Sequence, residues 1–200
     1  QATDLTTIAG YTNGNVFVQS TMKITGTSVQ VTAVVGDVNS FNSAATATLT
    51  DPHTLPQLKA INNAIGGTIT LSNYGVALSG LTADVKAALA GTFAAAYTGD
   101  VTLTDANTAD INAVDITTIA GDTTGTVTVS NNIDINGTSA EVAAAVGNVN
   151  TFSGAATATL SDAHTLTQLK TINDAIPGTI TLSSYNVGLS GSTADVKAAL

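Results

Sequence analysis

The 200-residue sequence contains no cysteine, few aromatic residues and few charged residues. The absence of cysteine excludes disulfide bonds, thiol catalysis and zinc-thiolate sites. Charged residues make up 10% of the chain, well below the roughly 25% that is usual in soluble domains. Only 5 lysine and arginine residues oppose 14 acidic residues, so we do not expect nucleic-acid binding. Because no run of about 18 apolar residues occurs, we do not expect a transmembrane helix either.

The main feature of the sequence is an internal repeat. Residues 51–59 (DPHTLPQLK) recur 111 positions later as residues 162–170 (DAHTLTQLK). Without any gap, roughly 58 of the 89 positions in residues 1–89 are identical to those in residues 112–200. The repeat predicts a first copy of four coils over residues 1–111 and a second, truncated copy over residues 112–200, both within one continuous solenoid.

Two alternating patterns fill each copy. Short segments such as residues 46–50 and 126–130 alternate apolar residues with threonine or serine, which predicts strands with one buried and one wet face. Between strands, Leu55, Leu58, Ile61 and Ile65 form one helical stripe. The spacing predicts a helix after residue 51, with an N-cap at that residue and a stop at residues 66–67 in the first copy and 177–178 in the second.

Two further helices are predicted from capping boxes. Residues 27–30 (TSVQ) and 138–141 (TSAE) place a hydroxyl and an amide or carboxylate three residues apart, ahead of runs rich in alanine and valine. Strands that recur every 23–32 residues through a helix must run parallel. We therefore predict a right-handed α/β solenoid with one parallel strand and one helix per coil of about 23–32 residues. A closed barrel or a doubly wound sheet is the competing topology.

Threonine is concentrated on the predicted outer strand face. Stacked coils are expected to align it in two neighbouring files. The first file is Thr46, Thr68, Thr102, Thr126, Thr157 and Thr179, and the second is Thr48, Thr70, Thr104, Thr128, Thr159 and Thr181. Strand propensity alone accounts for such a face. The alternatives are a glycan-decorated or self-associating surface, and an ice-binding surface, because the alternation resembles that of β-solenoid antifreeze proteins.

Acidic residues and histidines are the remaining candidates for chemistry. Asp51, Asp105 and Asp162 each follow a predicted strand, where a helix N-cap is expected and a calcium ligand is the alternative. No acidic loop of the EF-hand or nonapeptide type accompanies them. His53 and His164 are expected to be surface residues early in their helices. We find no combination of residues that is typical of an enzyme active site. We therefore predict no catalytic and no cofactor-binding residue.

Two segments also carry a resemblance. The pattern D-x-x-T-x-x-Q-L-K-x-I-N-x-A-I-x-G-T-I-T-L at residues 51–71 and 162–182, with G-T-V-T-V-S at residues 125–130, resembles repeats of very large extracellular cyanobacterial surface proteins with an adhesin-like organisation of the RTX type. The resemblance implies a secreted, surface-attached protein. We therefore expect a structural segment of an extracellular fibre, sheath or surface layer, whose partners are further repeats joined head to tail. The alternative is an adhesin, or a glycan- or ice-binding module.

Overall fold

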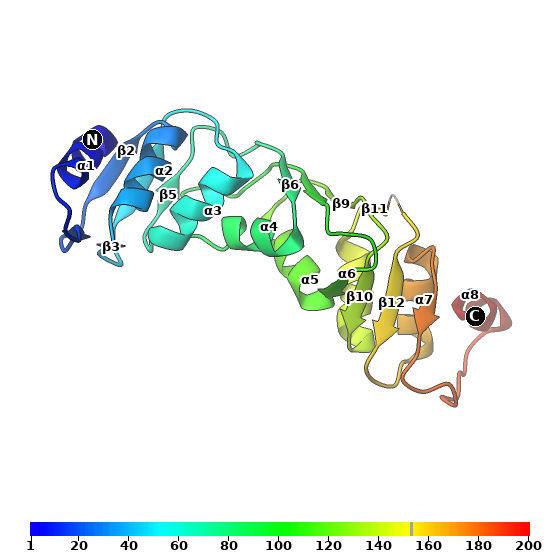
Figure 1. Cartoon of the computed structure of the whole chain (residues 1–200). Coiled ribbons are helices and arrows are strands. Elements are labelled where there is room, and N and C mark those ends of the chain that lie inside the picture. The colour runs from blue at the N-terminus through cyan, green and yellow to red at the C-terminus, as the bar shows by residue number, and fades with distance from the viewer. Residues whose placement is uncertain (153) are drawn as a thin grey trace. The chain divides into compact units, whose positions relative to one another are not determined.

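The computed structural model describes residues 1–152 and 154–200, and it alternates short strands with helices (Figure 1). The first part of the chain comprises α1 (Ala2–Gly10), β1 (Phe17–Val18), β2 (Lys23–Gly26), α2 (Ser28–Asp37), β3 (Ser40–Phe41), β4 (Thr46–Leu49), α3 (Leu55–Ala64), β5 (Ile69–Thr70), β6 (Leu78–Gly80) and α4 (Thr82–Leu89). The remainder comprises β7 (Val101–Leu103), β8 (Asp110–Asn112), α5 (Ala113–Asp122), β9 (Val127–Val129), β10 (Asp134–Gly137), α6 (Ser139–Asn148), β11 (Thr151–Phe152), β12 (Thr157–Leu160), α7 (Leu166–Ala175), β13 (Ile180–Thr181) and α8 (Thr193–Ala199).

The strands pair in parallel, in sheets with the orders β1-β3, β2-β4-β5, β11-β9-β7-β6 and β13-β12-β10-β8. Paired strands are separated by a helix in the sequence, so each pair closes one turn of the chain. The predicted α/β class, with repeating strand–helix units in parallel sheets, is confirmed. Several turns of the structure contain a second short strand that was not predicted. β1 and β2 both lie between α1 and α2, and β3 and β4 both lie between α2 and α3.

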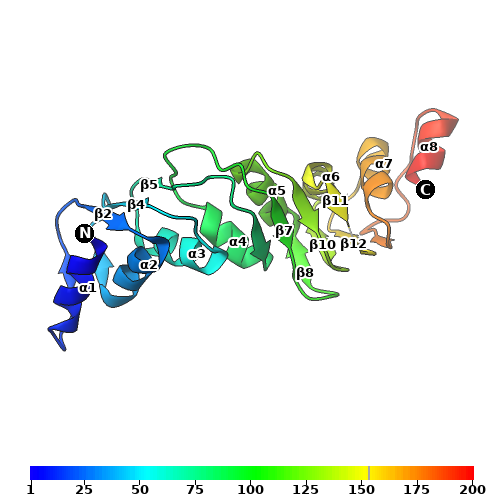
Figure 2. The same ribbon diagram turned by 90° about the horizontal axis from the view of Figure 1, so that it is seen from above.

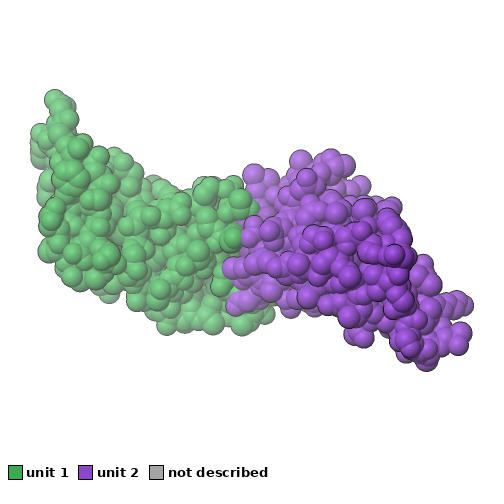
Figure 3. All heavy atoms as spheres, turned by 90° about the horizontal axis from the view of Figure 1, so that it is seen from below, with its two compact units in different colours: residues 1–78, 83–100, 122–125 green, residues 79–82, 101–121, 126–200 purple. Residues whose placement is uncertain are grey.

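Two compact units divide the chain (Figure 3). Unit 1 comprises Gln1–Leu78, Ala83–Asp100 and Asp122–Gly125, and unit 2 comprises Ser79–Thr82, Val101–Gly121 and Thr126–Leu200. Within unit 1, α1, α2 and α3 pack side by side, and within unit 2 the same is true of α6, α7 and α8 (Figures 1 and 2). Each unit thus pairs a row of helices with parallel strands.

The sequence repeat is reproduced as a repeat of structure. The elements α1, β1, β2, α2, β3, β4, α3 and β5 recur in the same order as α5, β9, β10, α6, β11, β12, α7 and β13. Pairing recurs as well, because Ala47 lies opposite Ile69 in the first copy and Ala158 lies opposite Ile180 in the second. The two copies therefore follow the same local path.

Local sequence explains most helix starts. In α2 the Thr27 hydroxyl accepts from the Gln30 amide while the Gln30 side chain accepts from the Thr27 amide, and Thr138 and Glu141 do the same in α6. Both predicted capping boxes are confirmed. The predicted N-cap at Asp51 is wrong, because α3 begins at Leu55. The Gln57 side chain accepts from the amide of the true N-cap residue, Thr54, at 2.9 Å.

Glycines at the ends of α3 and α7 have a different role from the predicted helix stop. No glycine among the described residues has a positive φ. A Cβ on Gly67 would lie 2.5 Å from the Ala45 carbonyl oxygen, and one on Gly178 would lie 2.5 Å from the Ala156 carbonyl oxygen. Glycine is required here because the backbones of successive turns approach closely.

The core consists of aliphatic side chains that alternate with half-buried polar ones along each strand. In β4, Ala47 and Leu49 are buried while Thr46 and Thr48 are half-buried, as the alternating pattern predicts. Leucine and isoleucine on the inner helix faces, such as Leu58 in α3, complete the core. Among the described residues no helix combines the length and the hydrophobicity that crossing a bilayer requires.

Candidate functional site

The predicted threonine files lie on strands of three different sheets, and neighbours align only within each sheet. In unit 1, Thr48 lies between Thr25 and Thr70 in register, with Thr46 opposite Lys23. Parallel pairing places such side chains about 4.8 Å apart. Thr68 lies directly before β5 and is half-buried. The first sheet therefore carries a short threonine ladder.

Unit 2 holds the other predicted threonines in two sheets. Thr102 lies opposite Thr128, whereas the predicted files placed Thr102 beside Thr126. Thr104 follows β7 directly, and Thr126 precedes β9. The two files do not extend without a break across all the strands, because the strands that carry them do not all pair with one another.

The last sheet of unit 2 carries a polar groove with a volume of about 500 Å³. Thr159 lies between Asn136 and Thr181 in register, and Thr157 lies opposite Asp134. The groove is lined by Thr108, Asp110, Asn132, Asp134, Ala155, Thr157, Thr159, Thr179 and Thr181. Four of the predicted ladder residues thus share one hollow.

Hydrogen bonds orient the hydroxyls of this polar groove. Both carboxylate oxygens of Asp134 accept, one from the Thr157 hydroxyl and one from the Thr159 hydroxyl, each at 2.8 Å. Asp110 lies directly opposite Asp134 on the adjacent strand. Because the two hydroxyl protons are used, the threonine oxygens and the carboxylates present acceptors to the groove. Such a surface suits a ligand rich in hydrogen-bond donors.

The three candidate metal ligands form hydrogen bonds between successive turns of the chain. A carboxylate oxygen of Asp51 accepts from the Ser28 amide at 2.6 Å, and Asp162 repeats this contact with Ser139 at 2.6 Å. Both amides belong to the first residue of a helix in the preceding turn, 23 residues earlier in the sequence. Each aspartate therefore satisfies a free donor at the start of a neighbouring helix.

Asp105 makes the most extensive of these contacts. Its carboxylate oxygens accept from the Thr82 amide at 3.1 and 3.0 Å, and one of them also accepts from the Thr82 hydroxyl. Both residues are buried. Within the described residues, no group of three or more histidine or acidic side chains is placed to hold a metal ion. The aspartates thus act as caps between turns, and sequence reasoning missed only which helix they cap.

The two histidines are buried, so the predicted surface position is wrong. His53 and His164 are 4% and 5% exposed. His53 Nε2 lies 3.0 Å from the Tyr97 hydroxyl, which itself donates to the Val76 carbonyl oxygen at 2.6 Å. The imidazole therefore donates from Nε2 to the tyrosine oxygen, and its Nδ1 has no hydrogen-bond partner among the residues that the structure describes.

Burial sets the protonation of this pair. Desolvation lowers the pKa of His53, although the negative charge of Asp51 partly opposes the shift. Burial also raises the pKa of Tyr97. Both side chains are therefore neutral near pH 7. A neutral histidine that donates to a tyrosine, which in turn donates to a carbonyl oxygen, supports the core, and the packing of its ring against that of Tyr97, 5.9 Å between centroids, agrees with that role.

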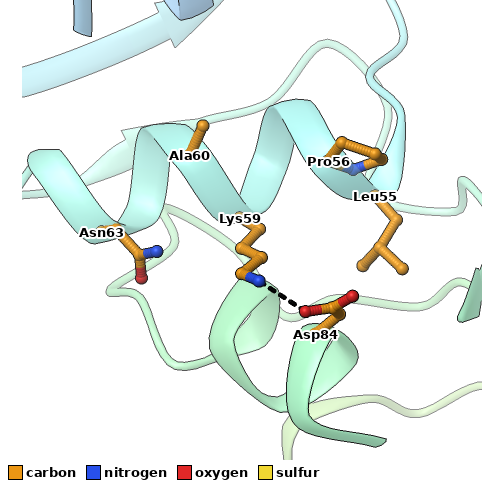
Figure 4. A pocket seen from close by; sticks show the side chains of 6 residues that line it. All are labelled: Leu55, Pro56, Lys59, Ala60, Asn63 and Asp84. Atoms are coloured by element: carbon orange, nitrogen blue, oxygen red, sulfur yellow. Dashed lines mark hydrogen bonds and ion pairs between the residues drawn. The ribbon is translucent and has the colours of Figure 1, made fainter. Parts of the chain in front are cut away.

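A smaller hollow lies between α3 and α4 in unit 1. It has a volume of about 280 Å³, and the Lys59 ammonium donates to the Asp84 carboxylate across it (Figure 4). A matching hollow of about 330 Å³ beside α7 is lined in part by Lys170 and Asp195, but there Lys170 pairs with Asp174 at 3.0 Å. These ion pairs are half-exposed and contribute little stability.

Apart from the polar groove of unit 2, these groups form contacts between turns of the chain. The aspartate caps and the buried histidine link successive turns of the chain. No protein-family model matches this chain, and no curated protein is significantly similar to it in sequence.

Proposed function

We propose that the chain is a structural repeat segment of an extracellular fibre, sheath or surface-layer protein. In this role, turns stack in register and repeats continue head to tail as one right-handed solenoid. The observation that carries the proposal is the close match between the copies in element order, strand pairing and caps between turns. A chain selected for extension by identical units keeps such ties in every copy.

The surface composition is consistent with this role. A net charge of −9 and exposed threonines keep a long assembly hydrated and oppose its lateral aggregation. The similarity of residues 51–71 and 162–182 to repeats of extracellular cyanobacterial surface proteins also favours a location at the cell surface. The partners are then further repeats of the same kind.

Electron microscopy of tandem copies of residues 1–111 tests the proposal. Four turns per copy, with strands about 4.8 Å apart and packed helices about 8–10 Å apart, predict that each added copy lengthens a particle by a fixed increment of roughly 19–40 Å. Stiff rods that grow by this increment support a structural role. Separate globular particles joined by flexible linkers contradict it, because such a chain could not transmit load along its length.

The polar groove of unit 2 favours one alternative, an adhesive or glycan-binding module. Its carboxylates and oriented hydroxyls match a ligand rich in hydrogen-bond donors. A glycan array probed with the chain and with a Thr159→Val variant tests this role. Binding that the variant loses favours the module, and thermal hysteresis in the same comparison would favour ice binding.

A further inference from the structure

The chain contains two asparagine–glycine dipeptides, Asn13–Gly14 and Asn136–Gly137. An asparagine before glycine is especially prone to spontaneous deamidation, in which the next backbone nitrogen attacks the side-chain amide. Glycine favours this attack because it has no side chain to block the approach and its backbone is mobile. The two dipeptides lie in different structural settings, so the fold determines which of them reacts.

Asn13 lies in the exposed loop between α1 and β1. Thr12, Asn13 and Gly14 are all exposed and belong to no helix or strand. The Gly14 amide donates to the Thr12 hydroxyl oxygen at 2.9 Å, a bond within the loop that opens without disturbing the sheets. The Asn13 side chain forms no hydrogen bond with any residue that the structure describes. The side-chain amide and the attacking nitrogen are therefore free to meet.

The exposure of Asn13 follows from the local turn and not from its place near the first residue. The corresponding residue of the second copy, Thr124, is exposed as well, although a preceding turn is present there. That turn contacts the loop directly, because the Thr124 amide donates to the Tyr97 carbonyl oxygen at 2.9 Å. The Gly125 amide also donates to the Thr123 hydroxyl oxygen at 3.0 Å, so the same local turn occurs in both copies.

Asn136 is held within a sheet. It lies on the inner strand β10, in register with Asn112 of β8 on one side and Thr159 of β12 on the other. The Ser161 amide donates to the Gly137 carbonyl oxygen at 2.8 Å. Attack by the Gly137 nitrogen bends the backbone out of the extended conformation, so it requires β10 to leave the sheet.

We propose that Asn13 is a site of spontaneous deamidation and that the fold protects Asn136 from the same reaction. The Gly14 nitrogen attacks the side-chain carbonyl carbon of Asn13 and forms a bond with it. The side-chain nitrogen leaves as ammonia and takes up the proton that the Gly14 nitrogen loses. Water then opens the cyclic imide. Cleavage of the bond to the side-chain carbon gives aspartate, and cleavage of the bond to the backbone carbon gives isoaspartate.

Either product changes the first copy alone. Aspartate and isoaspartate both add a negative charge to the loop, and isoaspartate also adds a carbon to the backbone between α1 and β1. The second copy does not follow, because Thr124 has no side-chain amide. The two copies, which are similar when synthesised, therefore become chemically different as the protein ages.

Peptide mass spectrometry of the intact chain, incubated at mildly alkaline pH, tests the proposal. We expect Asn13 to convert at least about tenfold faster than Asn136 in the folded chain, because the latter reacts only after local opening. In urea the two asparagines should convert at similar rates, since both dipeptides are then equally accessible. Circular dichroism confirms the folded and unfolded states of the two samples.

Two variants are matched controls. Asn13→Thr installs the residue of the second copy and should abolish the product. Gly14→Ala should slow the reaction without disturbing the loop, because its Cβ would lie no closer than 3.3 Å to a neighbouring atom, the Thr12 hydroxyl oxygen. An Asn13 that reacts in urea but stays intact in the folded chain overturns the proposal. Equal conversion of the two asparagines in the folded chain also overturns it, and so do unequal rates in urea, which would assign the difference to sequence and not to the fold.

Discussion

Removal of the Asp105 carboxylate tests whether caps between turns hold the fold together. Asp105→Ala leaves the Thr82 amide and hydroxyl without their acceptor in a buried site. A lost hydrogen bond to a charged group costs about 1.5–3 kcal/mol, and two donors are affected here. Because the two losses are not additive, we expect the free energy of unfolding to fall by about 3 kcal/mol. For a chain of this size, the melting temperature should fall by about 6–12 °C.

Denaturant unfolding followed by circular dichroism measures this change. Asp105→Asn keeps one acceptor for the Thr82 amide and should lose about half as much stability. Asp37→Ala, which removes an exposed carboxylate at the end of α2, is the control and should change stability by less than about 0.5 kcal/mol. In a double-mutant cycle, Thr82→Val should cost less when Asp105 is already alanine. A loss for Asp105→Ala no larger than that of the control would refute the reasoning.

Three further predictions concern the histidine, the glycines and the repeat. Burial lowers the pKa of His53 below its ordinary value of 6.5, so the unfolded state binds the proton first and stability should fall as the pH drops below about 6.5. Urea titrations between pH 5 and 8 should show a smaller slope for His53→Gln, and an equal slope would contradict this account. Gly67→Ala should destabilise by about 1–3 kcal/mol because of its carbonyl contact, whereas Gly36→Ala, with open space in α2, should stabilise by about 0.5–1 kcal/mol. Ile119→Ala should cost about 2–5 kcal/mol and Ile8→Ala less than about 1.5 kcal/mol, and equal losses would show that burial does not separate these repeat positions.

Sequence reasoning succeeded where the determining contacts are local. The capping boxes at Thr27 and Thr138 involve residues three positions apart, so the residue types alone specify them. Alternation of apolar residues with threonine likewise predicted the strands, because side chains of a strand point to opposite faces. The repeat carried these local signals into both copies.

Sequence reasoning failed where the partner lies on another turn. Asp51 precedes α3 in sequence but caps α2, because its carboxylate accepts from the Ser28 amide of the preceding turn. His53 looked like a surface residue, yet Tyr97, 44 positions later, covers it and accepts its hydrogen bond. A periodic pattern does not reveal which side chain of the next turn faces a given residue.

The predicted threonine files also failed because the sequence does not reveal which strands are neighbours in a sheet. A run of threonines at regular spacing predicts side chains on one face, but not which strands are neighbours. In the observed register β7 pairs with β9, so Thr102 lies opposite Thr128 and not opposite Thr126. A shift of two residues keeps the side chains on the same face, so the alternation cannot distinguish the two registers.

Comparison of the two copies shows how much of a residue's burial comes from its own turn and how much comes from the adjoining turn. Isoleucine occupies the corresponding positions 8 and 119, and the helices around these residues are nearly identical in sequence. Ile119 is fully buried, whereas Ile8 is 55% exposed. The difference in exposure therefore comes from the adjoining turn, and much of the hydrophobic stabilisation of a turn depends on being covered on both sides. A chain built in this way gains stability with each turn that is added, which is a property that the proposed structural role would require.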